Sequence, residues 1–355
     1  MWFKDNIKNN KPILALSPMA DMTDSAFCQI VREIGGADIV FREMVSSEAI
    51  IRDNEKTIGM TDFKEVERPI VQQIFGADPT TMAMAATKVM EHSNPEGIDI
   101  NMGCPVYKLT SNFNGAALMK DPKLASKIIQ EIKRAIGDTP LSVKIRLGWD
   151  NPDTFKTFIP IIEDAGADLI TMHGRTKKQG YSGKSDWERL RQAKEIATVP
   201  FLANGDIAES NQVKEALNKT GADGVLIARG ALGNPWFFKK VLEPNFDVDI
   251  KERIRIVLEH AKYHTKHQAW LRSLTKKNKL HGITSEELEK TAIVTFRKHL
   301  SWYFKTNKIG FEITGIKEFR AKLVRINSIE ELEQLLTEFQ HYSHSMVPGG
   351  LFVTS

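Results

Sequence analysis

The sequence predicts an α/β protein built as a (β/α)₈ TIM barrel and followed by a small C-terminal helical bundle. Short apolar runs alternate eight times with helix-like segments over about 240 residues. A Gly-Ala-Asp triplet precedes three of these runs, at residues 36–38, 166–168 and 221–223. Beyond Pro244 no strand signal remains. Together these observations favour a closed parallel barrel with a helical appendage.

The eight predicted strands are apolar throughout, which suits parallel strands buried on both faces. They are Ile13–Leu16, Ile39–Arg42, Ile70–Phe75, Ile98–Asn101, Leu141–Ile145, Leu169–Met172, Phe201–Ala203 and Gly224–Ile227. The glycine of each triplet fits the left-handed residue that ends a helix. A doubly wound open sheet is the alternative, but no Gly-x-Gly-x-x-Gly follows the first strand.

The region after the barrel has helical periodicity. We expect helices over Lys251–Arg272, from a Thr284-x-x-Glu287 capping box onward, over residues 316–325 and over residues 329–339. The second of these should bury Leu288, Ala292, Ile293, Phe296, Leu300 and Phe304, and should carry Lys290, Arg297, Lys298 and Lys305 elsewhere. We therefore expect a barrel domain over residues 1–243, a helical domain over 246–340 and a frayed tail over 341–355.

Composition narrows the class of protein. No run of about 18 apolar residues exists, and residues 1–11 lack the apolar core of a signal peptide, so we expect no membrane span and a cytoplasmic location. Two cysteines are too few for a disulfide framework, and we expect no metal site. Residues 251–325 hold 18 Lys and Arg against 7 Asp and Glu, a net of +11, which leaves −7 elsewhere. This imbalance suggests that the helical region meets a polyanion.

Polar residues and glycines crowd the C-terminal ends of the predicted strands, where barrel enzymes carry their active sites. The glycine-rich loops after strands 7 and 8, with Gly205, Gly230, Gly233 and Arg229, resemble the phosphate site of such barrels. Ordinary turn glycines are the alternative. Lys144 should point into the barrel mouth, where it meets either a ligand or a structural partner, Asp99 or Asp206. His173 is equally compatible with a ligand contact and with a buried core histidine.

Cys104 is the strongest single candidate for a catalytic residue. It stands in Gly103-Cys104-Pro105, directly beyond strand 4, and an ordinary thiol is protonated at neutral pH and can donate a proton. Cys28 lies in the helical run 27–34 and is expected in the core.

Several motifs at these positions resemble the tRNA-dihydrouridine synthase family, in the bacterial form without zinc or double-stranded-RNA modules. They are residues 17–24 (SPMADMTD), 99–105 (DINMGCP), 144–146 (KIR), 173–176 (HGRT), 203–207 (ANGDI), 230–236 (GALGNPW) and 297–303 (RKHLSWY). The resemblance spans residues 13–325. It implies a barrel that holds FMN and a helical domain that grips tRNA.

The resemblance also implies roles for individual residues. Cofactor contacts are expected at Ser17, Pro18, Met19, Gln73, Asn101, Lys144, His173, Asn204, Gly205, Asp206, Ala228 and Arg229. RNA contacts are expected at Arg175, Lys290, Arg297, Lys298 and Lys305. Ser17 and Ala228 depart from the family pattern, which has alanine and glycine there.

The resemblance implies that NADPH first reduces FMN. The reduced FMN then reduces the C5=C6 bond of uridine in tRNA, and Cys104 supplies the proton at C5. No obligate protein partner is implied. One alternative is an FMN barrel that acts on a free pyrimidine, like dihydroorotate dehydrogenase, but it leaves the basic helical region unexplained. A second is an RNA-binding module without chemistry, which leaves Cys104, Lys144 and His173 unexplained.

Overall fold

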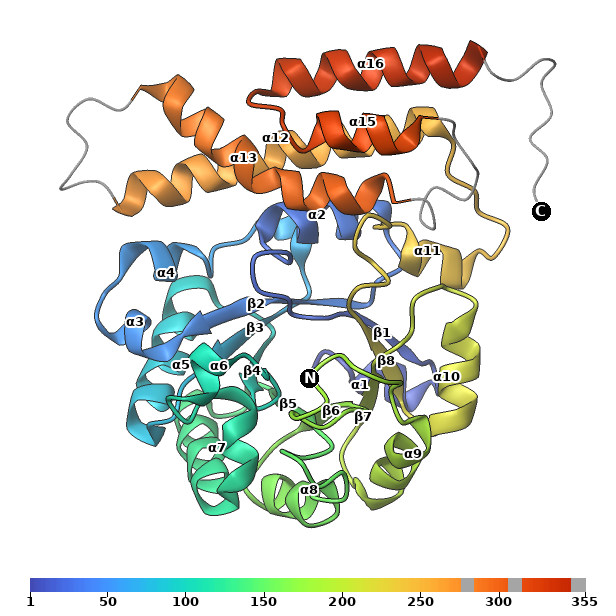
Figure 1. Ribbon diagram of the computed structural model, residues 1–355. Helices are drawn as coiled ribbons and strands as arrows, with labels where there is room; N and C mark the ends of the chain where they lie inside the picture. Colours follow the sequence, from blue (N-terminus) through green and yellow to red (C-terminus); the bar gives the residue numbers. More distant parts are fainter. Residues whose placement is uncertain (276–283, 306–314, 346–355) are drawn as a thin grey trace.

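The computed structural model describes residues 1–275, 284–305 and 315–345, and it forms a closed eight-stranded parallel barrel with a helical bundle on one side (Figure 1). The strands are β1 (Ile13–Leu16), β2 (Ile39–Ser46), β3 (Ile70–Phe75), β4 (Gly97–Asn101), β5 (Leu141–Arg146), β6 (Leu169–His173), β7 (Phe201–Asn204) and β8 (Gly224–Ile227). All eight predicted strands are confirmed, and β2 alone runs several residues past its predicted end.

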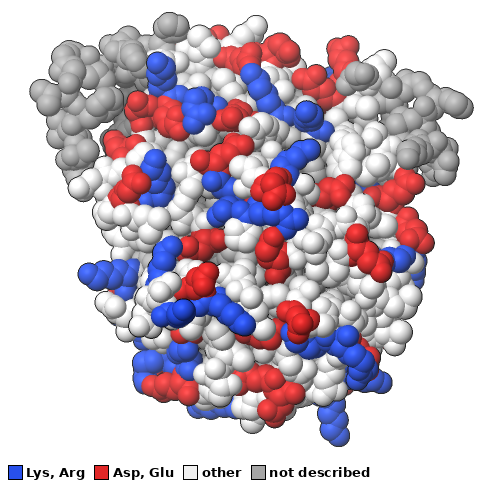
Figure 2. All heavy atoms as spheres, turned by 180° about the vertical axis from the view of Figure 1, so that it is seen from behind, with Lys and Arg blue, Asp and Glu red and all other residues white. Residues whose placement is uncertain are grey.

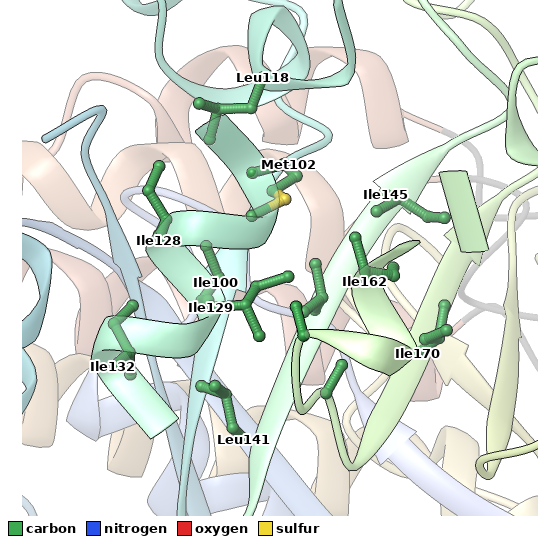
Figure 3. Packing of buried hydrophobic residues seen from close by; sticks show 14 of the residues in the cluster. Ile100, Met102, Leu118, Ile128, Ile129, Ile132, Leu141, Ile145, Ile162 and Ile170 are labelled. Carbon is green, nitrogen blue, oxygen red and sulfur yellow. The ribbon is translucent and has the colours of Figure 1, made fainter. Parts of the chain in front are cut away.

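Helices cover the outside of the barrel. They are α2 (Ser25–Ile34), α3 (Ser47–Ile51), α4 (Glu55–Gly59), α5 (Pro79–Ser93), α7 (Pro122–Ile136), α8 (Phe155–Asp164), α9 (Trp187–Ile196), α10 (Gln212–Thr220) and α11 (Phe237–Leu242), with the 3-10 turn η1 (Glu65–Glu67). The short helix α6 (Tyr107–Thr110) and the 3-10 turn η2 (Gly115–Lys120) belong instead to the loop between β4 and α7. Aliphatic side chains of α7 and α8 pack on β4, β5 and β6 in the layer that Figure 3 shows. This layer is the largest core of the molecule.

A second core fills the barrel interior. Phe41, Leu169 and Leu202 point inward, and Phe3, from the segment before α1 (Lys4–Lys8), packs among them. The Trp2 ring lies 6.1 Å from that of Phe41, edge to face. The first residues of the chain therefore close the end of the barrel at which the strands begin, which leaves the C-terminal ends of the strands as the open face.

The Gly-Ala-Asp triplets have a common structural role. Asp38 accepts a hydrogen bond from the Leu14 backbone at 2.9 Å, and Asp223 accepts one from the Phe201 backbone at 2.7 Å. Asp168 does the same for Leu141 at 2.8 Å. Each aspartate begins one strand and binds the first residues of the preceding strand, so the repeat sets the register between neighbours. The predicted left-handed helix end is present at Gly221.

The bundle consists of α12 (Ile250–Thr275), α13 (Ser285–Tyr303), α15 (Ile316–Leu323) and α16 (Ile329–Ser345), and α12 packs against α2 and α4 of the barrel. The Thr284–Glu287 capping box is confirmed. The apolar face of α13 is buried as predicted, except that Leu288 is half-buried. The helix α16 runs to Ser345, beyond the predicted start of the tail at residue 341. Residues 346–355 lie outside the described part of the chain.

Among the described helices, none combines the length and the apolar composition that crossing a bilayer requires.

Candidate active site

The open face of the barrel gathers polar side chains from five consecutive strands. Gln73 lies on β3, Asn101 ends β4, Lys144 lies on β5, His173 ends β6 and Asn204 ends β7. Because parallel strands end on the same side, these residues, which are far apart in the sequence, meet at one opening. The structure thus brings together the residues that the sequence predicts for a cofactor site.

Hydrogen bonds order the floor of this opening. Gln73 donates to Asp99 at 2.6 Å and accepts from the Asn101 amide at 2.8 Å. Ser142 donates to the other oxygen of Asp99 at 2.6 Å. Burial raises the pKa of Asp99 to about 6, although these hydrogen bonds oppose the shift. Asp99 therefore anchors Gln73 from below and does not face the opening as a free carboxylate.

Lys144 has a neutral partner. Its ammonium donates to Asn204 Oδ1 at 3.3 Å. The two carboxylates that could have paired with it are occupied, since Asp99 binds Gln73 and Ser142, and Asp206 binds Arg175. Burial, and then the neighbouring charge of Arg146, lower the pKa of Lys144 to about 8. A cation held in this way in a desolvated opening is suited to an anionic or electron-rich ligand.

His173 is buried and uncharged at neutral pH. Burial, followed by the charges of Lys144 and Arg146, lowers the pKa of His173 to about 2. Arg175 Nη1 lies 3.2 Å from His173 Nε2. Since a guanidinium can only donate, Nε2 accepts and Nδ1 carries the ring proton.

The turn after β7 has an uncommon backbone. Gly205 has φ 116° and Asp206 has φ 57°, a left-handed conformation that is uncommon for residues other than glycine. A Cβ on Gly205 would lie 2.6 Å from the His173 ring and 2.5 Å from Ser185 Oγ, so only glycine fits. Asp206 holds the turn by accepting from Arg175 at 2.7 Å and from the Ser185 backbone at 2.7 Å. The strained turn is thus fixed by an ion pair directly beside His173.

The loop after β8 differs in part from its prediction. Ala228 is half-buried and Arg229 is exposed, with its guanidinium 3.6 Å from Asp206. Gly233, which the sequence places in the phosphate loop, instead faces the bundle, because a Cβ there would lie 2.3 Å from the Trp302 backbone. Gly233 therefore allows the barrel and the bundle to pack closely against each other. Gly230 likewise faces protein atoms, the carbonyl oxygen of Ile207 among them.

Cys104 is half-buried beside Asn101, in a loop that three contacts hold in place. Asn101 Oδ1 accepts from the Cys104 backbone at 2.9 Å. Arg146 donates to the Gly103 carbonyl at 2.7 Å, and Ala116 donates to the Cys104 carbonyl at 3.1 Å. The thiol therefore stands at a defined position at the rim of the opening.

The comparisons identify the family to which this architecture belongs. A family model described as dihydrouridine synthase (Dus) matches residues 14–345. The chain belongs to the dihydrouridine synthase family. A probable tRNA-dihydrouridine synthase of Rickettsia conorii is 33% identical over 342 residues, which cover 94% of this chain and 95% of the relative. The tRNA-dihydrouridine synthase B of Pseudomonas aeruginosa is 32% identical and covers 89% of each chain.

Solved structures support the fold. Histamine dehydrogenase from a Rhizobium species superposes with a TM-score of 0.55 at 12% identity, over 95% of this chain and 63% of that one. A 2-naphthoyl-CoA reductase complex superposes with a TM-score of 0.52 at 12% identity, over 65% and 50% of the two chains. At such low identity these matches concern the barrel fold alone.

The residues predicted to contact the cofactor after β1 lie where this strand ends at the open face. Ser17 is buried, and its backbone donates to Ile227 across the β1–β8 closure at 2.8 Å. Pro18 and Met19 follow at the rim, and the Met19 backbone donates to Thr23 Oγ1 at 2.8 Å. Only the backbone of Ser17 is used in this closure, so serine serves where the family has alanine. Cys28 is fully buried in α2, as predicted for a core residue.

Two of the predicted RNA contacts have internal partners. Arg175 is buried, and it binds Asp206 and the carbonyls of Ser182 and Gly183. Arg297 donates to the carbonyls of Arg325 and Ile326 beyond the end of α15. Both guanidinium groups thus hold loops in place through hydrogen bonds within the protein. Lys290 and Lys305 are exposed, and Lys298 is half-buried.

Arg146 has a role in the site that the sequence does not reveal. It stands two positions after Lys144 on the same strand, and alternation directs both side chains to one face. Besides Gly103, it donates to the carbonyls of Thr176 and Gly180 at 2.9 Å each. Arg146 therefore joins the Cys104 loop to the loop after β6. The signal that could have found it is its spacing from Lys144 within the KIR motif.

Proposed function

We propose that the protein reduces the C5=C6 bond of uridine in tRNA to 5,6-dihydrouridine, with FMN as its flavin, NADPH as its source of electrons and Cys104 as the proton donor. Membership of the dihydrouridine synthase family supports the reaction, as do the names of the bacterial relatives. The observation that carries the mechanism is the meeting of Lys144 and Cys104 at one opening, which the hydrogen bonds of Asn101 and Asn204 organise.

The residues of the opening fit a flavin mononucleotide. Lys144 has a neutral hydrogen-bond partner and is suited to the electron-rich edge of an isoalloxazine ring. Gln73 and Asn101 offer amides beside it. The Ser185 hydroxyl is buried without a hydrogen-bond partner among the described residues and lies next to the Gly205 turn. We assign Lys144, Gln73, Asn101 and His173 to the ring, and the loops after β7 and β8, with Arg229, to the phosphate.

When bound and reduced, FMN supplies the hydride that uracil C6 accepts. That carbon is electrophilic because its double bond is conjugated with the C4 carbonyl, and the electron pair then moves to C5. Cys104 gives its S–H proton to C5, which completes the new C–H bond and leaves a thiolate. Asn101 and Arg146 keep the thiol in place by binding the backbone of residues 103 and 104.

His173 acts in its neutral form. Its low pKa means that it takes up no proton from Cys104 and adds no positive charge to the opening at neutral pH. Lys144 therefore supplies the charge that stabilises the electron-rich ring, while Arg146 adds positive charge nearby and holds the Cys104 loop.

The test is mass spectrometry of an unmodified tRNA transcript incubated with the protein and NADPH. We expect uridines that gain 2 Da, and acid should release FMN from the purified protein. Reduction of free uridine with no change in tRNA would favour the free-pyrimidine enzyme instead. Protein without flavin that cannot be reconstituted with FMN would overturn the proposal.

A further inference from the structure

The loop that follows Cys104 exposes apolar and aromatic side chains. The exposed fraction is 53% for Val106, 80% for Tyr107 and 41% for Phe113. Among the described residues only four aromatic side chains are exposed, and three of them, Tyr107, Phe113 and Tyr181, belong to loops on the open face of the barrel. Exposed aromatic residues gathered around a catalytic face indicate a surface that binds a partner.

The same loops carry positive charge without negative charge. Residues 104–120 and 174–185 contain Lys108, Lys120, Arg175, Lys177, Lys178 and Lys184, and neither segment contains an aspartate or glutamate. Lys108, Lys178 and Lys184 are exposed, and none of them forms an ion pair within the described part of the chain. This sector of the rim therefore complements a polyanion.

Tyr107 and Phe113 lie on a segment that is anchored close to Cys104. Arg146 donates to the Gly103 carbonyl before the segment, and Ala116 after it donates to the Cys104 carbonyl, so the segment begins and ends next to Cys104. Phe113 has φ 60°, which is rare for a bulky side chain. The fold keeps an aromatic residue in a strained conformation at the surface, although a polar residue there would satisfy solvent better.

We propose that this aromatic loop, defined as residues 106–113, is a stacking platform for the unpaired nucleotides that flank the target uridine. The proposal rests on the proposed function, because a uridine that leaves its stack deprives its neighbours of a stacking partner. Tyr107 and Phe113 replace that partner, while Lys108, Lys178 and Lys184 neutralise the phosphates between these bases. The barrel thus holds the RNA at the reacting base, in addition to any grip by the bundle.

Tyr181 is not part of this platform. Its ring faces the guanidinium groups of Arg229 at 5.3 Å and Arg146 at 5.8 Å. Since both arginines line the opening, we assign the exposed Tyr181 ring to the rim of the active site rather than to the loop after Cys104.

The experiment measures the affinity of a fluorescein-labelled, unmodified tRNA transcript by anisotropy at two salt concentrations. Tyr107→Ala and Phe113→Ala should each weaken binding roughly 5- to 100-fold, the range for removal of one base–aromatic stack, and should leave the salt dependence unchanged. Tyr107→Trp should restore affinity. By contrast, Lys178→Gln with Lys184→Gln should flatten the dependence of log affinity on log salt by about 0.7 for each phosphate that is no longer neutralised.

The matched control is Met84→Ala, which removes an exposed apolar side chain from α5 on the flank of the barrel and should bind like wild type. Flavin content and NADPH oxidation without tRNA should match wild type in every variant. If Tyr107→Ala binds as tightly as wild type, or Met84→Ala binds as weakly as Tyr107→Ala, the platform is wrong, even where wild type forms dihydrouridine. If wild type itself leaves tRNA unmodified, the proposed function fails instead.

Discussion

Two regions of this molecule bury clusters of ionisable side chains, and they treat them differently. One is the opening of the barrel, around Lys144. The other, which we call the seam, lies where α12 and α13 meet α2, and it consists of Asp24, His260, His264, Thr295, His299 and Tyr303. Both regions bury polar groups, and a buried polar group needs a hydrogen-bond partner.

In the seam the hydrogen bonds join one element to another, although His260 Nε2 and His299 Nε2 are buried without a partner among the described residues. Asp24 caps α2 by accepting from the Phe27 backbone at 3.1 Å, and its second oxygen lies 2.8 Å from His264 Nδ1. His264 Nε2 continues to Thr295 at 2.8 Å. One chain of hydrogen bonds therefore runs from the barrel through α12 to α13. Burial by itself would raise the pKa of Asp24, but the charge and hydrogen bond of His264 hold that pKa well below its usual range.

In the opening the partners are incomplete. Lys144 has a neutral amide, and the Ser185 hydroxyl has no hydrogen-bond partner among the described residues. The difference teaches how to separate structural from functional polar clusters. A cluster whose members bind one another across two elements holds those elements together, whereas a cluster left short of partners at an open face is prepared for a ligand.

The largest expected effect lies at the opening. Cys104→Ala should lower the rate of uridine reduction roughly 10²- to 10⁴-fold, the usual range for removal of a general acid. Flavin binding and its reduction by NADPH should persist, since the contacts that order this loop are made by backbone atoms. Single-turnover rates with tRNA measure the effect. Cys28→Ala is the matched control, because Cys28 is buried in α2. Normal turnover by Cys104→Ala would assign the proton to another group.

The next effect concerns the charge of the opening. Lys144→Ala should slow flavin reduction or uridine reduction by about 10²-fold, as expected when a preorganised electrostatic interaction is removed. Lys133→Ala is a suitable control, because Lys133 pairs with Asp168 on the outside of the barrel at 2.7 Å. Stopped-flow absorbance of the flavin separates the two half-reactions. An unchanged rate in both would contradict the role of Lys144.

The opening is far more predictable from the sequence than the seam. Strand ends can be located from apolar runs, and the barrel then brings the residues near them together, so Gln73, Lys144 and Asn204 can be grouped without a structure. Asp24 and His264 are 240 positions apart, and no periodicity connects them. Nor does the sequence show that Arg175 and Arg297, which are predicted to contact RNA, also bind backbone carbonyls of the protein.

A third prediction uses acid to probe the seam. Burial lowers the pKa of His260 to about 3 and also lowers that of His299. Outside the seam, burial lowers the pKa of His267 on α12 to about 4. Groups whose pKa is depressed by folding stabilise the protein fully above their unfolded pKa, near 6.5, and lose that contribution as the pH falls toward the folded value. We therefore expect the free energy of unfolding to decline as the pH falls below about 6.5.

Two carboxyl groups act against this trend. Burial raises the pKa of Glu43 to about 7 and of Asp99 to about 6, so acidification through that range favours the folded state. The variant His299→Leu isolates the contribution of the seam to the pH dependence of stability. The Nε2 atom of His299 is buried without a partner among the described residues, so the substitution removes a titrating ring without breaking a hydrogen bond at that atom. This variant should reduce the pH dependence by up to about 1.4 kcal/mol per pH unit between about pH 4 and 6. Urea unfolding measures it, and identical pH profiles would place the acid sensitivity elsewhere.

The smallest expected effect concerns the charge of the bundle. Over residues 246–340 there are 18 Lys and Arg and 13 Asp and Glu, so the net charge is +5 rather than the +11 of residues 251–325. The difference comes from Asp247 and Asp249 before α12 and from four glutamates of α16, with no added cation. Lys262 already pairs with Glu333 of α16 at 2.8 Å. On the face that Figure 2 shows, basic and acidic side chains alternate rather than forming one continuous basic patch.

The bundle should therefore contribute few phosphate contacts, and Lys290 and Lys298 are the candidates on α13 that have no ion pair within the described residues. Changing both to Glu should flatten the dependence of log tRNA affinity on log salt by about 1.4 to 1.8, which is about 0.7 to 0.9 for each phosphate that is no longer neutralised. Arg297 is left intact because its hydrogen bonds hold the segment after α15, and its removal would confuse unfolding with weaker binding. The matched control changes the charge of the bundle in the opposite direction, by replacing Glu330 and Glu331 of α16 with Lys. The variant with Glu at positions 290 and 298 could keep the wild-type salt dependence while the variant Lys178→Gln with Lys184→Gln loses part of it. In that case the phosphates are bound by the rim of the barrel, and the bundle recognises the shape of the RNA.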